Sequence, residues 1–285
     1  MYRDIEIPEP IDRQPQQRER GQTEQPPLPT DEREPILDQN RDERRTVFAL
    51  GSQDYRLNTN QARMLADVGR FRVVNKNDLL KQVYKGQEHA FNRDLTHLHR
   101  QNLVRIVSRP DRSKFIVLTK PAKQLTEQYL RTHPGQQIYD GAKKLREMQH
   151  DAALYRLYEK AAEDICRRGG RPQRVVLDFE MRKRINRELV KLQGLPKSQR
   201  EAGLRRIAQQ ENLKAVNGKL PIPDVRIEYE TSEGERSVCD LEFITKHYRA
   251  ELTAEKKAAG FQLYSEGGRG RKVHGPDLMG EILSL

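Results

Sequence analysis

The chain has 285 residues, and its 53 Lys and Arg against 42 Asp and Glu give a formal net charge of +11. This excess favours a polyanionic partner, because Lys and Arg gain affinity by releasing the counterions condensed on it. No apolar run approaches the roughly 20 residues that cross a bilayer, and no apolar signal core is found, which argues against a membrane protein and a secreted one. The lack of a CxxC pair argues against a disulfide scaffold and a zinc ribbon. We therefore expect a cytoplasmic protein.

Residues 1–45 alternate Pro, Gln, Glu, Asp and Arg and hold almost no apolar cluster. A segment of this composition cannot bury enough surface to offset its ordering entropy, so it is expected to be a disordered leader. It is either a tether for a partner or an inert leader. Residues 46–57 then predict a short strand that leads into the first domain.

Residues 59–120 have the pattern of a winged helix-turn-helix. Small and apolar residues at helical spacing predict a helix in TNQARMLADVGRFRV, and a short helix follows in NDLLKQVY. The third predicted helix, QEHAFNRDLTHLHRQN, carries Phe91, Leu95 and Leu98 as its buried stripe. LVRIVSRPDRSKFIVLT then predicts two strands around a turn at residues 109–112, because Pro-Asp interrupts the apolar runs.

Polar and basic side chains fall on the third helix outside its apolar stripe and at the tip of the hairpin. A helix fits the major groove of DNA, and a basic hairpin beside it contacts the backbone. The predicted DNA contacts are Asn92, Arg93, Thr96 and Arg100 in the helix and Arg109, Arg112 and Lys114 in the hairpin. The alternative is a small helical subdomain whose basic face is only solvated.

A further helix in PAKQLTEQYLRTH is interrupted by His133-Pro134-Gly135, where we expect a domain boundary. The first domain is therefore placed at residues 46–135, a linker at 136–142, a second domain at 143–265 and a flexible basic tail at 266–285.

The second domain begins with a long predicted helix over residues 143–168, which has an apolar side at helical spacing and ends at Gly169-Gly170. RVVLDFEM predicts a strand. Two highly charged helices are expected at about residues 182–193 and 197–212. Their Lys and Arg residues either lie along DNA or form a solvated face.

Residues 223–246 predict a β-hairpin, with strands DVRIEYE and RSVCDLEFIT joined by TSEGE. Because strand side chains alternate between faces, Asp224, Asp240 and Glu242 share the face opposite the apolar one. Carboxylates brought together repel unless they are separated, protonated or bridged by a cation, and Mg²⁺ or Mn²⁺ suits their hard oxygens. These three acids are therefore candidate metal ligands, and a metal there would activate water and stabilise charge on a phosphate.

Pro223-Asp224 followed by Asp240-Leu241-Glu242 resembles the PD-(D/E)xK pattern of restriction-endonuclease-like domains. The preceding helix and strand, and the helix expected at residues 251–260, fit the order of elements in that fold. A winged helix followed by such a domain is similar to the replication-relaxation family of plasmid and mobile-element proteins. The resemblance covers residues 59–264 and implies a mixed α+β or α/β chain of bacterial origin, with a helical insertion in the nuclease-like domain.

For the site, the resemblance implies metal binding by Asp224 and by Asp240 or Glu242, with Glu159 or Glu163 on the long helix as an auxiliary ligand. The residues depart from the pattern at its lysine, because Glu242 or Ile244 stands where lysine is expected.

Lys246 has the right strand face but lies further along the chain, so the candidate catalytic set is Asp224, Asp240, Glu242 and a migrated Lys246. An active Mg²⁺-dependent nuclease, a degenerate nuclease-like domain and an ordinary solvated hairpin all remain open.

The function expected from these patterns is sequence-dependent binding of double-stranded DNA by a plasmid or mobile-element protein. Such a protein would act as an accessory or regulator together with replication or relaxation proteins. The first alternative is a Mg²⁺-dependent DNA endonuclease or nicking enzyme. The second is an adaptor whose basic surface binds an acidic protein.

Overall fold

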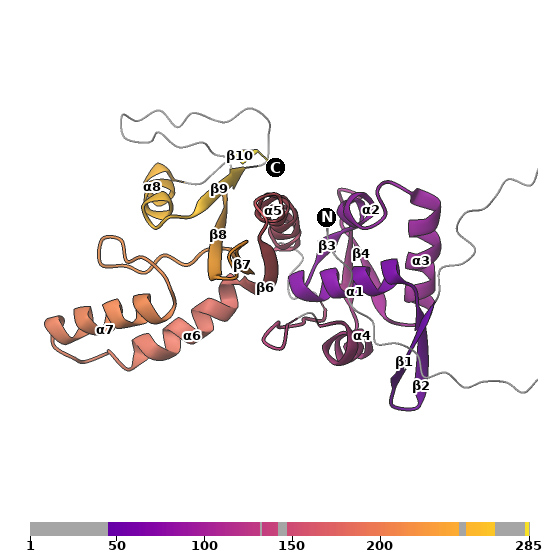
Figure 1. The fold of residues 1–285 in the computed structure, drawn as a ribbon, viewed down its shortest axis with the longest axis horizontal. Coiled ribbons are helices and arrows are strands. Elements are labelled where there is room, and N and C mark those ends of the chain that lie inside the picture. Colours follow the sequence, from indigo (N-terminus) through magenta and orange to yellow (C-terminus); the bar gives the residue numbers. More distant parts are fainter. Residues whose placement is uncertain (1–44, 132, 142–146, 245–248, 266–282, 285) are drawn as a thin grey trace, which may run out of the picture.

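The computed structural model describes residues 45–131, 133–141, 147–244, 249–265 and 283–284 (Figure 1). Within these residues the chain is mixed α+β, with eight α-helices and three sheets. The expected leader up to residue 44, Lys246 and nearly all of the expected tail lie outside the described residues.

The N-terminal half starts with an antiparallel hairpin, β1 (Thr46–Leu50) and β2 (Gln53–Leu57), where the sequence predicts a single strand. The chain reverses at Gly51, whose φ of +61° is readily available to glycine. The three predicted helices and the predicted hairpin follow as α1 (Thr59–Phe71), β3 (Val74–Asn75), α2 (Lys76–Gln82), α3 (Glu88–Arg100), β4 (Val104–Ser108) and β5 (Lys114–Leu118). The strands form an antiparallel sheet in the order β3-β5-β4.

Local chemistry explains the ends of these elements. Asn58 caps α1 by accepting a 2.8 Å hydrogen bond from the Gln61 backbone amide, and the Gln61 side chain accepts one of 3.1 Å from the Asn58 amide. The predicted stripe of α3 is confirmed, because Phe91, Leu95 and Leu98 are all buried. After β5 the chain forms α4 (Lys120–Leu125), which continues as a π-helical turn (Thr126–Leu130).

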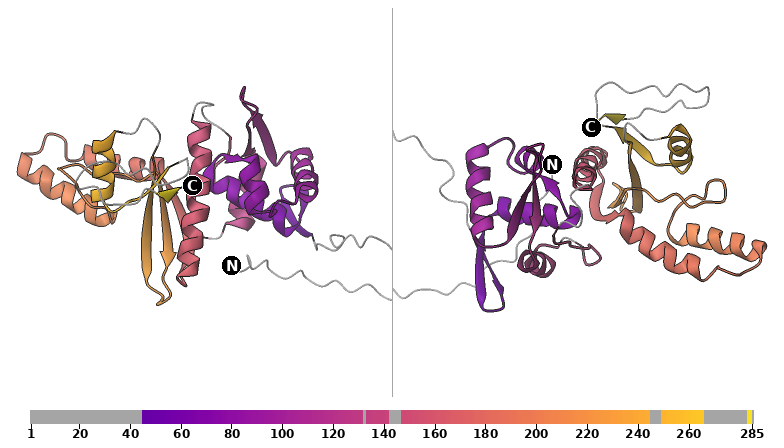
Figure 2. Two further views of the ribbon diagram at one scale, coloured as in Figure 1. Left: turned by 90° about the horizontal axis from the view of Figure 1, so that it is seen from above. Right: turned by 180° about the vertical axis from the view of Figure 1, so that it is seen from behind.

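The C-terminal half is built on a five-stranded sheet in the order β10-β9-β8-β7-β6. Its elements are α5 (Met148–Arg167), β6 (Arg171–Leu177), α6 (Asp178–Val190), α7 (Lys197–Gln210), β7 (Val225–Glu230), β8 (Arg236–Ile244), α8 (Ala250–Ala258), β9 (Gln262–Ser265) and β10 (Leu283–Ser284). β6, β7 and β8 are antiparallel neighbours, whereas β8, β9 and β10 run parallel. Figures 1 and 2 show α5 on one side of this sheet and α6, α7 and α8 on the other.

The strand predicted in RVVLDFEM is wrong in its second half, because β6 ends at Leu177 and α6 begins at Asp178. The Glu180 carboxylate accepts a hydrogen bond from the Leu177 backbone amide at 3.4 Å, which satisfies a free donor at the start of a helix. Asp178 and Glu180 also place negative charge in the first helical turn, where the helix dipole favours it.

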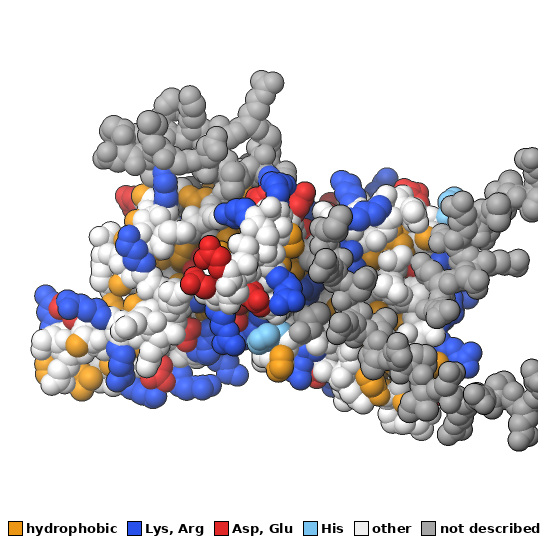
Figure 3. Space-filling model, in the orientation of Figure 1, with side chains coloured by type: hydrophobic (Ala, Val, Ile, Leu, Met, Phe, Trp, Pro, Cys, Tyr) orange, Lys and Arg blue, Asp and Glu red, His pale blue; other side chains and the backbone are white. Residues whose placement is uncertain are grey.

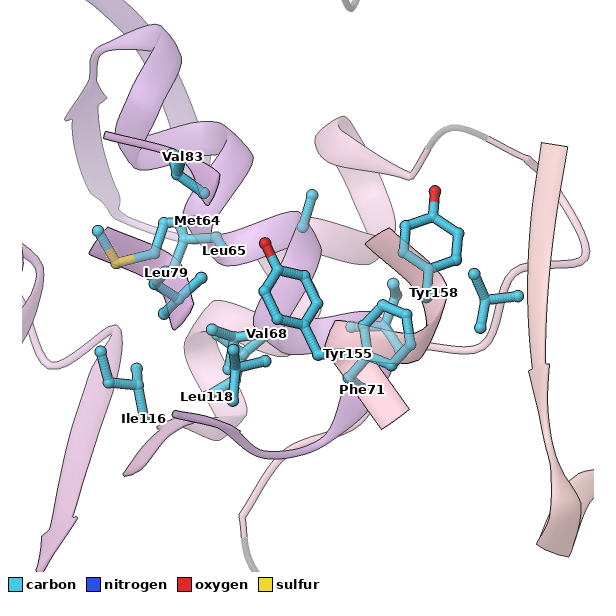
Figure 4. Packing of buried hydrophobic residues seen from close by; sticks show 14 of the residues in the cluster. Met64, Leu65, Val68, Phe71, Leu79, Val83, Ile116, Leu118, Tyr155 and Tyr158 are labelled. Carbon is cyan, nitrogen blue, oxygen red and sulfur yellow. The ribbon is translucent and has the colours of Figure 1, made fainter. Parts of the chain in front are cut away.

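α5 lies between the two halves and packs on both. Tyr155 and Tyr158 contact Phe71 of α1, with ring centroids 5.4 Å and 5.2 Å apart (Figure 4). A single cluster of buried apolar residues extends from Phe48 in β1 to Tyr264 in β9. The two halves therefore share a hydrophobic core.

Residues 136–141, where the sequence predicts a linker, are packed between the halves. The buried Gln136 side chain donates to the Val175 carbonyl at 3.0 Å and accepts from the Val175 amide at 2.8 Å, so it is bound to β6. The Tyr139 amide donates to the Gly69 carbonyl of α1 at 2.8 Å, and Ile138 is buried beside Gly69. The segment thus acts as a fixed connector.

In the part of the chain that the structure describes, none of the helices combines the length and apolar character needed to span a membrane.

Candidate functional site

The outer face of α3 is polar and solvent-exposed. Asn92, Arg93, Thr96 and Arg100 are all exposed on this helix, because the apolar residues between them point into the core. Asn92 is oriented by Lys76, whose ammonium donates to the Asn92 side-chain oxygen at 2.9 Å. The sequence prediction therefore placed these four residues correctly on the surface.

Arg93 has a second, structural role. Its Nε atom donates to the carboxylate of Asp94 at 3.1 Å, while its side chain stays 49% exposed. Asp94 is almost fully buried and also accepts hydrogen bonds from Asn58 at 3.0 Å and from the Tyr84 hydroxyl at 3.1 Å. Arg93 thus neutralises a buried acid that holds the start of α1 against α3.

The β4–β5 turn carries the second group of predicted contacts. The Arg109 amide donates to the Ser113 carbonyl at 3.0 Å, and Asp111 accepts from the Ser113 amide at 3.0 Å, so the turn is closed by its own hydrogen bonds. Arg109 is only partly exposed and lies 3.4 Å from Asp111, which offsets its charge. Arg112 and Lys114 are exposed and form no ion pair with another described residue.

Figure 2 shows the β4–β5 hairpin projecting from the N-terminal half. Arg100 on α3, like Arg112 and Lys114, is an exposed cation that forms no ion pair with a described residue, and a polyanion would stabilise this charge.

The predicted hairpin of the C-terminal half is confirmed, and so is the distribution of its faces. Val225 pairs with Leu241, so Asp224 and Glu242 stand opposite each other where β7 begins. The Asp224 amide donates to Glu242 Oε2 at 3.3 Å, and Asp224 Oδ2 accepts from the Phe243 amide at 2.9 Å. Each carboxylate is thereby held by a backbone amide of the opposing segment.

Two cations reach this pair from helices on either side of the sheet. Lys256 of α8 lies 2.9 Å from the carboxylate of Glu242, which is 3% exposed. His150 of α5 lies 3.6 Å from Asp224 Oδ2 and 3.8 Å from Asp151 Oδ1. The neighbouring carboxylates of Asp151 and Asp224 raise the pKa of His150 to about 10 against the opposing effect of burial, so the imidazole is protonated at neutral pH.

Asp240 does not join this pair. Arg226 holds it in a bidentate ion pair, with Nε 2.7 Å from Oδ1 and a terminal nitrogen 2.8 Å from Oδ2. Arg226 is buried and also donates to the carbonyls of Glu211 and Asn212 at the end of α7. The predicted triad of acids is therefore reduced to Asp224 and Glu242, because Arg226 binds the third.

The auxiliary acids that the resemblance implies lie elsewhere on α5. Glu159 follows His150 by nine residues, a rise of about 13 Å along a helix, and is buried near Asp67 and Arg70 of α1. Glu163 is exposed and pairs with Arg167 on its own helix at 3.3 Å. Neither acid is positioned beside Asp224.

Lys256 and His150 were missed as site residues by sequence reasoning. Lys256 comes from a helix 14 residues after Glu242, whereas the pattern places its lysine two residues on in the same strand. His150-Asp151 reads locally as a helix start, and only the packing of α5 on the sheet brings His150 to Asp224.

Among the described residues, no three His, Cys, Asp and Glu side chains are arranged to hold a metal ion. Comparison of the chain with protein families, with curated proteins and with solved structures gives no match.

Proposed function

We propose that the protein binds double-stranded DNA through a winged helix-turn-helix formed by α1 to β5. The order of three helices and a basic-tipped hairpin supports this assignment, as does the antiparallel order β3-β5-β4. In such a domain the third helix enters the major groove, so Asn92, Thr96 and Arg100 are the proposed base or groove contacts. Arg112 and Lys114 are the proposed backbone contacts.

The observation that carries the proposal is the exposure of Arg112 and Lys114 without an acidic partner among the described residues. Arg93 and Arg109 are expected to contribute less, because Asp94 and Asp111 already compensate them. Phosphate contacts position a protein on DNA without sequence preference, whereas base contacts supply specificity.

A salt titration of duplex binding tests this proposal. Arg112→Gln with Lys114→Gln should weaken binding to all duplexes and reduce the slope of log K against log salt by roughly 0.9 per lost contact, or about 1.8. The matched control is Arg167→Gln with Arg171→Gln, which removes the same charge from exposed residues that already pair with acids. Equal slopes in the two double variants would contradict the assignment of the turn.

The proposed cellular setting is a plasmid or mobile element, in which the protein acts with replication or relaxation proteins. The C-terminal half supports this setting through its order of elements: helix α5, antiparallel strands β6, β7 and β8, helix α8 and parallel strand β9, with α6 and α7 inserted. This order is the one expected of a restriction-endonuclease-like domain. The proposed role of that domain is non-enzymatic, because the acid pair is already balanced by Lys256 and His150.

A second candidate, a metal-dependent DNA nuclease, is favoured by one observation. The Asp224 amide is bound to the Glu242 carboxylate where β7 begins, and Lys256 brings an ammonium to the same carboxylate, although the sequence pattern lacks its lysine. The donor oxygens fit Mg²⁺ or Mn²⁺ in chemical type, and Asp224 and Glu242 would hold the ion. When bound, it would supply Lewis-acid activation of water and phosphate. Lys256 would hold the Glu242 carboxylate in its orientation.

Incubation of supercoiled plasmid with the protein and Mg²⁺ or Mn²⁺ separates the two functions. Metal-dependent nicking that is lost in Asp224→Asn, and retained in the control Glu235→Gln at the exposed hairpin turn, would establish the nuclease. Intact plasmid together with normal duplex binding would establish the non-enzymatic role. Lys256→Met should weaken nicking in the first case and leave duplex binding unchanged in both.

A further inference from the structure

The helices α6 and α7 form an arm that is inserted between two neighbouring strands of the sheet, β6 and β7. Figures 1 and 2 show the arm extending from the C-terminal half, at the end of the molecule opposite α3. Its inner side is apolar, because Met181, Ile185 and Ile207 are buried in a cluster that they share with Val176 of β6 and Leu263 of β9.

Charged contacts at the base of the arm fix its position. Arg184 of α6 forms a two-point ion pair with Glu211 at the end of α7, at 2.8 Å and 3.2 Å. Arg226 of β7 donates to the Glu211 and Asn212 carbonyls and so binds the same end to the sheet. The arm is therefore a rooted structural element whose outer surface is already ordered before any partner binds.

The outer surface of the arm is strongly basic. Figure 3 shows Lys and Arg side chains gathered along the lower edge of α6 and at the free end of the arm. The exposed cations that form no ion pair with a described residue are Lys183, Arg187, Lys197, Arg200, Arg205 and Arg206.

The two helices contribute to one positive field. The partly exposed Glu188 of α6 has a lowered pKa because Lys191 donates a hydrogen bond to it and because the charges of Lys191, Arg206 and Arg187 are close. Arg206 belongs to α7, so cations of both helices converge on one carboxylate. Three cations around one acid leave a surplus of positive charge.

We propose that this arm is a second DNA-binding surface, which contacts the phosphate backbone of a second duplex segment. The inference rests on the proposed function, in which α3 and the β4–β5 turn hold the first segment. The two surfaces lie at opposite ends of the molecule, so we assign each of them its own duplex segment (Figure 1). The protein would therefore bridge two DNA segments.

The chemistry of the arm favours a nucleic acid over an acidic protein. The strongest contacts of protein interfaces are rich in Trp and Tyr, whereas Phe179 is the sole aromatic residue in α6 and α7 and the exposed large apolar residues of the arm are Val190 and Leu195 near its turn. Phe179 is partly buried against Tyr139, so it is already engaged. A row of long cations on two antiparallel helices fits a regular polyanion, where binding follows from counterion release.

A two-duplex capture experiment with the full chain tests the proposal. One duplex is immobilised, the protein is added, and retention of a second, fluorescent duplex is measured. The arm variant is Arg187→Gln with Arg206→Gln, the turn variant is Arg112→Gln with Lys114→Gln, and the charge-matched control is Arg167→Gln with Arg171→Gln. Circular dichroism melting checks that all three variants fold.

The arm variant should keep its binding to the immobilised duplex and lose most retention of the second duplex, while the control retains it. The salt slope for retention of the second duplex should fall by roughly 0.9 per lost phosphate contact. The slope for binding of the first duplex should stay as in the wild type.

Retention of the second duplex by the arm variant at the control level would overturn the inference and leave the proposed function intact. That result would also arise if two copies of the chain bridged DNA through α3 alone. A different result is that the turn variant binds both duplexes as the wild type does, while the arm variant binds neither. This result would overturn the proposed function and, with it, the two-segment arrangement. Release of the second duplex by polyglutamate as readily as by free duplex would assign the arm to an acidic protein and overturn the inference.

Discussion

Glu159 shows how the fold sets the charge of a single residue. The side chain lies on α5 and is 8% exposed. Burial raises its pKa to about 7, and the charge of Asp67 adds to this effect while Arg70 and Arg63 oppose it. An acid whose pKa is higher in the folded chain than in the unfolded chain binds its proton more tightly when folded, so folding is favoured while the acid is protonated.

The raised pKa of Glu159 makes the free energy of unfolding depend on pH. The free energy of unfolding should fall as the pH rises from about 4.5, the ordinary pKa of the acid, to about 7, by roughly 1 to 3 kcal/mol. Glu159→Gln cannot ionise, so it should remove this fall in the free energy of unfolding with rising pH. Urea unfolding at a series of pH values measures the effect. Glu163→Gln on the exposed face of the same helix is the control. Persistence of the wild-type slope in Glu159→Gln would show that other groups cause it.

For single residues, the sequence predicted which face of a strand a side chain lies on better than it predicted which ion pair the side chain forms. Period-two alternation correctly placed Asp240 and Glu242 on the face of β8 opposite Leu241 and Phe243. It did not show that Arg226, directly opposite Asp240 in the register, would neutralise this acid. An ion pair depends on which side chains meet across strands and helices, and strand periodicity alone does not predict these meetings.

At the scale of elements, the close contact between α1 and the connector at residues 136–141 depends on Gly69. A methyl group on Gly69 would lie 2.8 Å from Ile138 Cγ2 and 3.1 Å from Leu118 Cδ1. Both neighbours are buried, so they have little room to move. The glycine is therefore required for packing, although alanine is the better helix former.

Gly69→Ala should destabilise the protein by about 1 to 3 kcal/mol, because the overpacking exceeds the gain of about 1 kcal/mol in helix propensity. The measurement is chemical denaturation of the single variants and of the double variant with Ile138→Ala, which removes the nearest contact atom. In the Ile138→Ala background the added methyl should cost less or stabilise. An equal cost of Gly69→Ala in both backgrounds would refute the steric explanation.

Most elements of the chain follow from periodicity and from turn residues. The stripe of α3 and the strands on either side of residues 109–112 are at their predicted places. The error at β6 arose because Phe179 and Met181 continue an apolar alternation. The cap that Glu180 supplies to Leu177 decided the outcome in favour of a helix.

At the scale of the whole molecule, the shared core couples the two halves. Tyr155 and Tyr158 of α5 contact Phe71 of α1, and one cluster of buried residues contains both β1 and β9. The connector is bound at one end to β6 and at the other to α1. A chain joined in this way is expected to unfold as one cooperative unit.

Hydrogen exchange measured by mass spectrometry tests this coupling. Peptides from α1 and from β7 should gain exchange at the same denaturant concentration. Phe71→Leu should lower the protection of both peptides together, because it removes ring contacts at the junction. Ile185→Val, in the cluster that packs α6 and α7 on β6 and β9, is the control for a core change away from the junction and should lower the protection of α1 less than Phe71→Leu does. Normal protection of β7 in Phe71→Leu would show that the halves unfold independently.

The sequence by itself determined the helices, the two hairpins, the excess of positive charge and the alternation that sets Asp224 opposite Glu242. These features depend on residues that are close in the chain, and local periodicity records them. Only the tertiary structure decided that α5 joins the halves, that residues 136–141 are packed, and that Lys256 and His150 balance the two acids. Such contacts join residues far apart in the sequence, and their formation depends on how the helices dock on the sheet rather than on any local pattern.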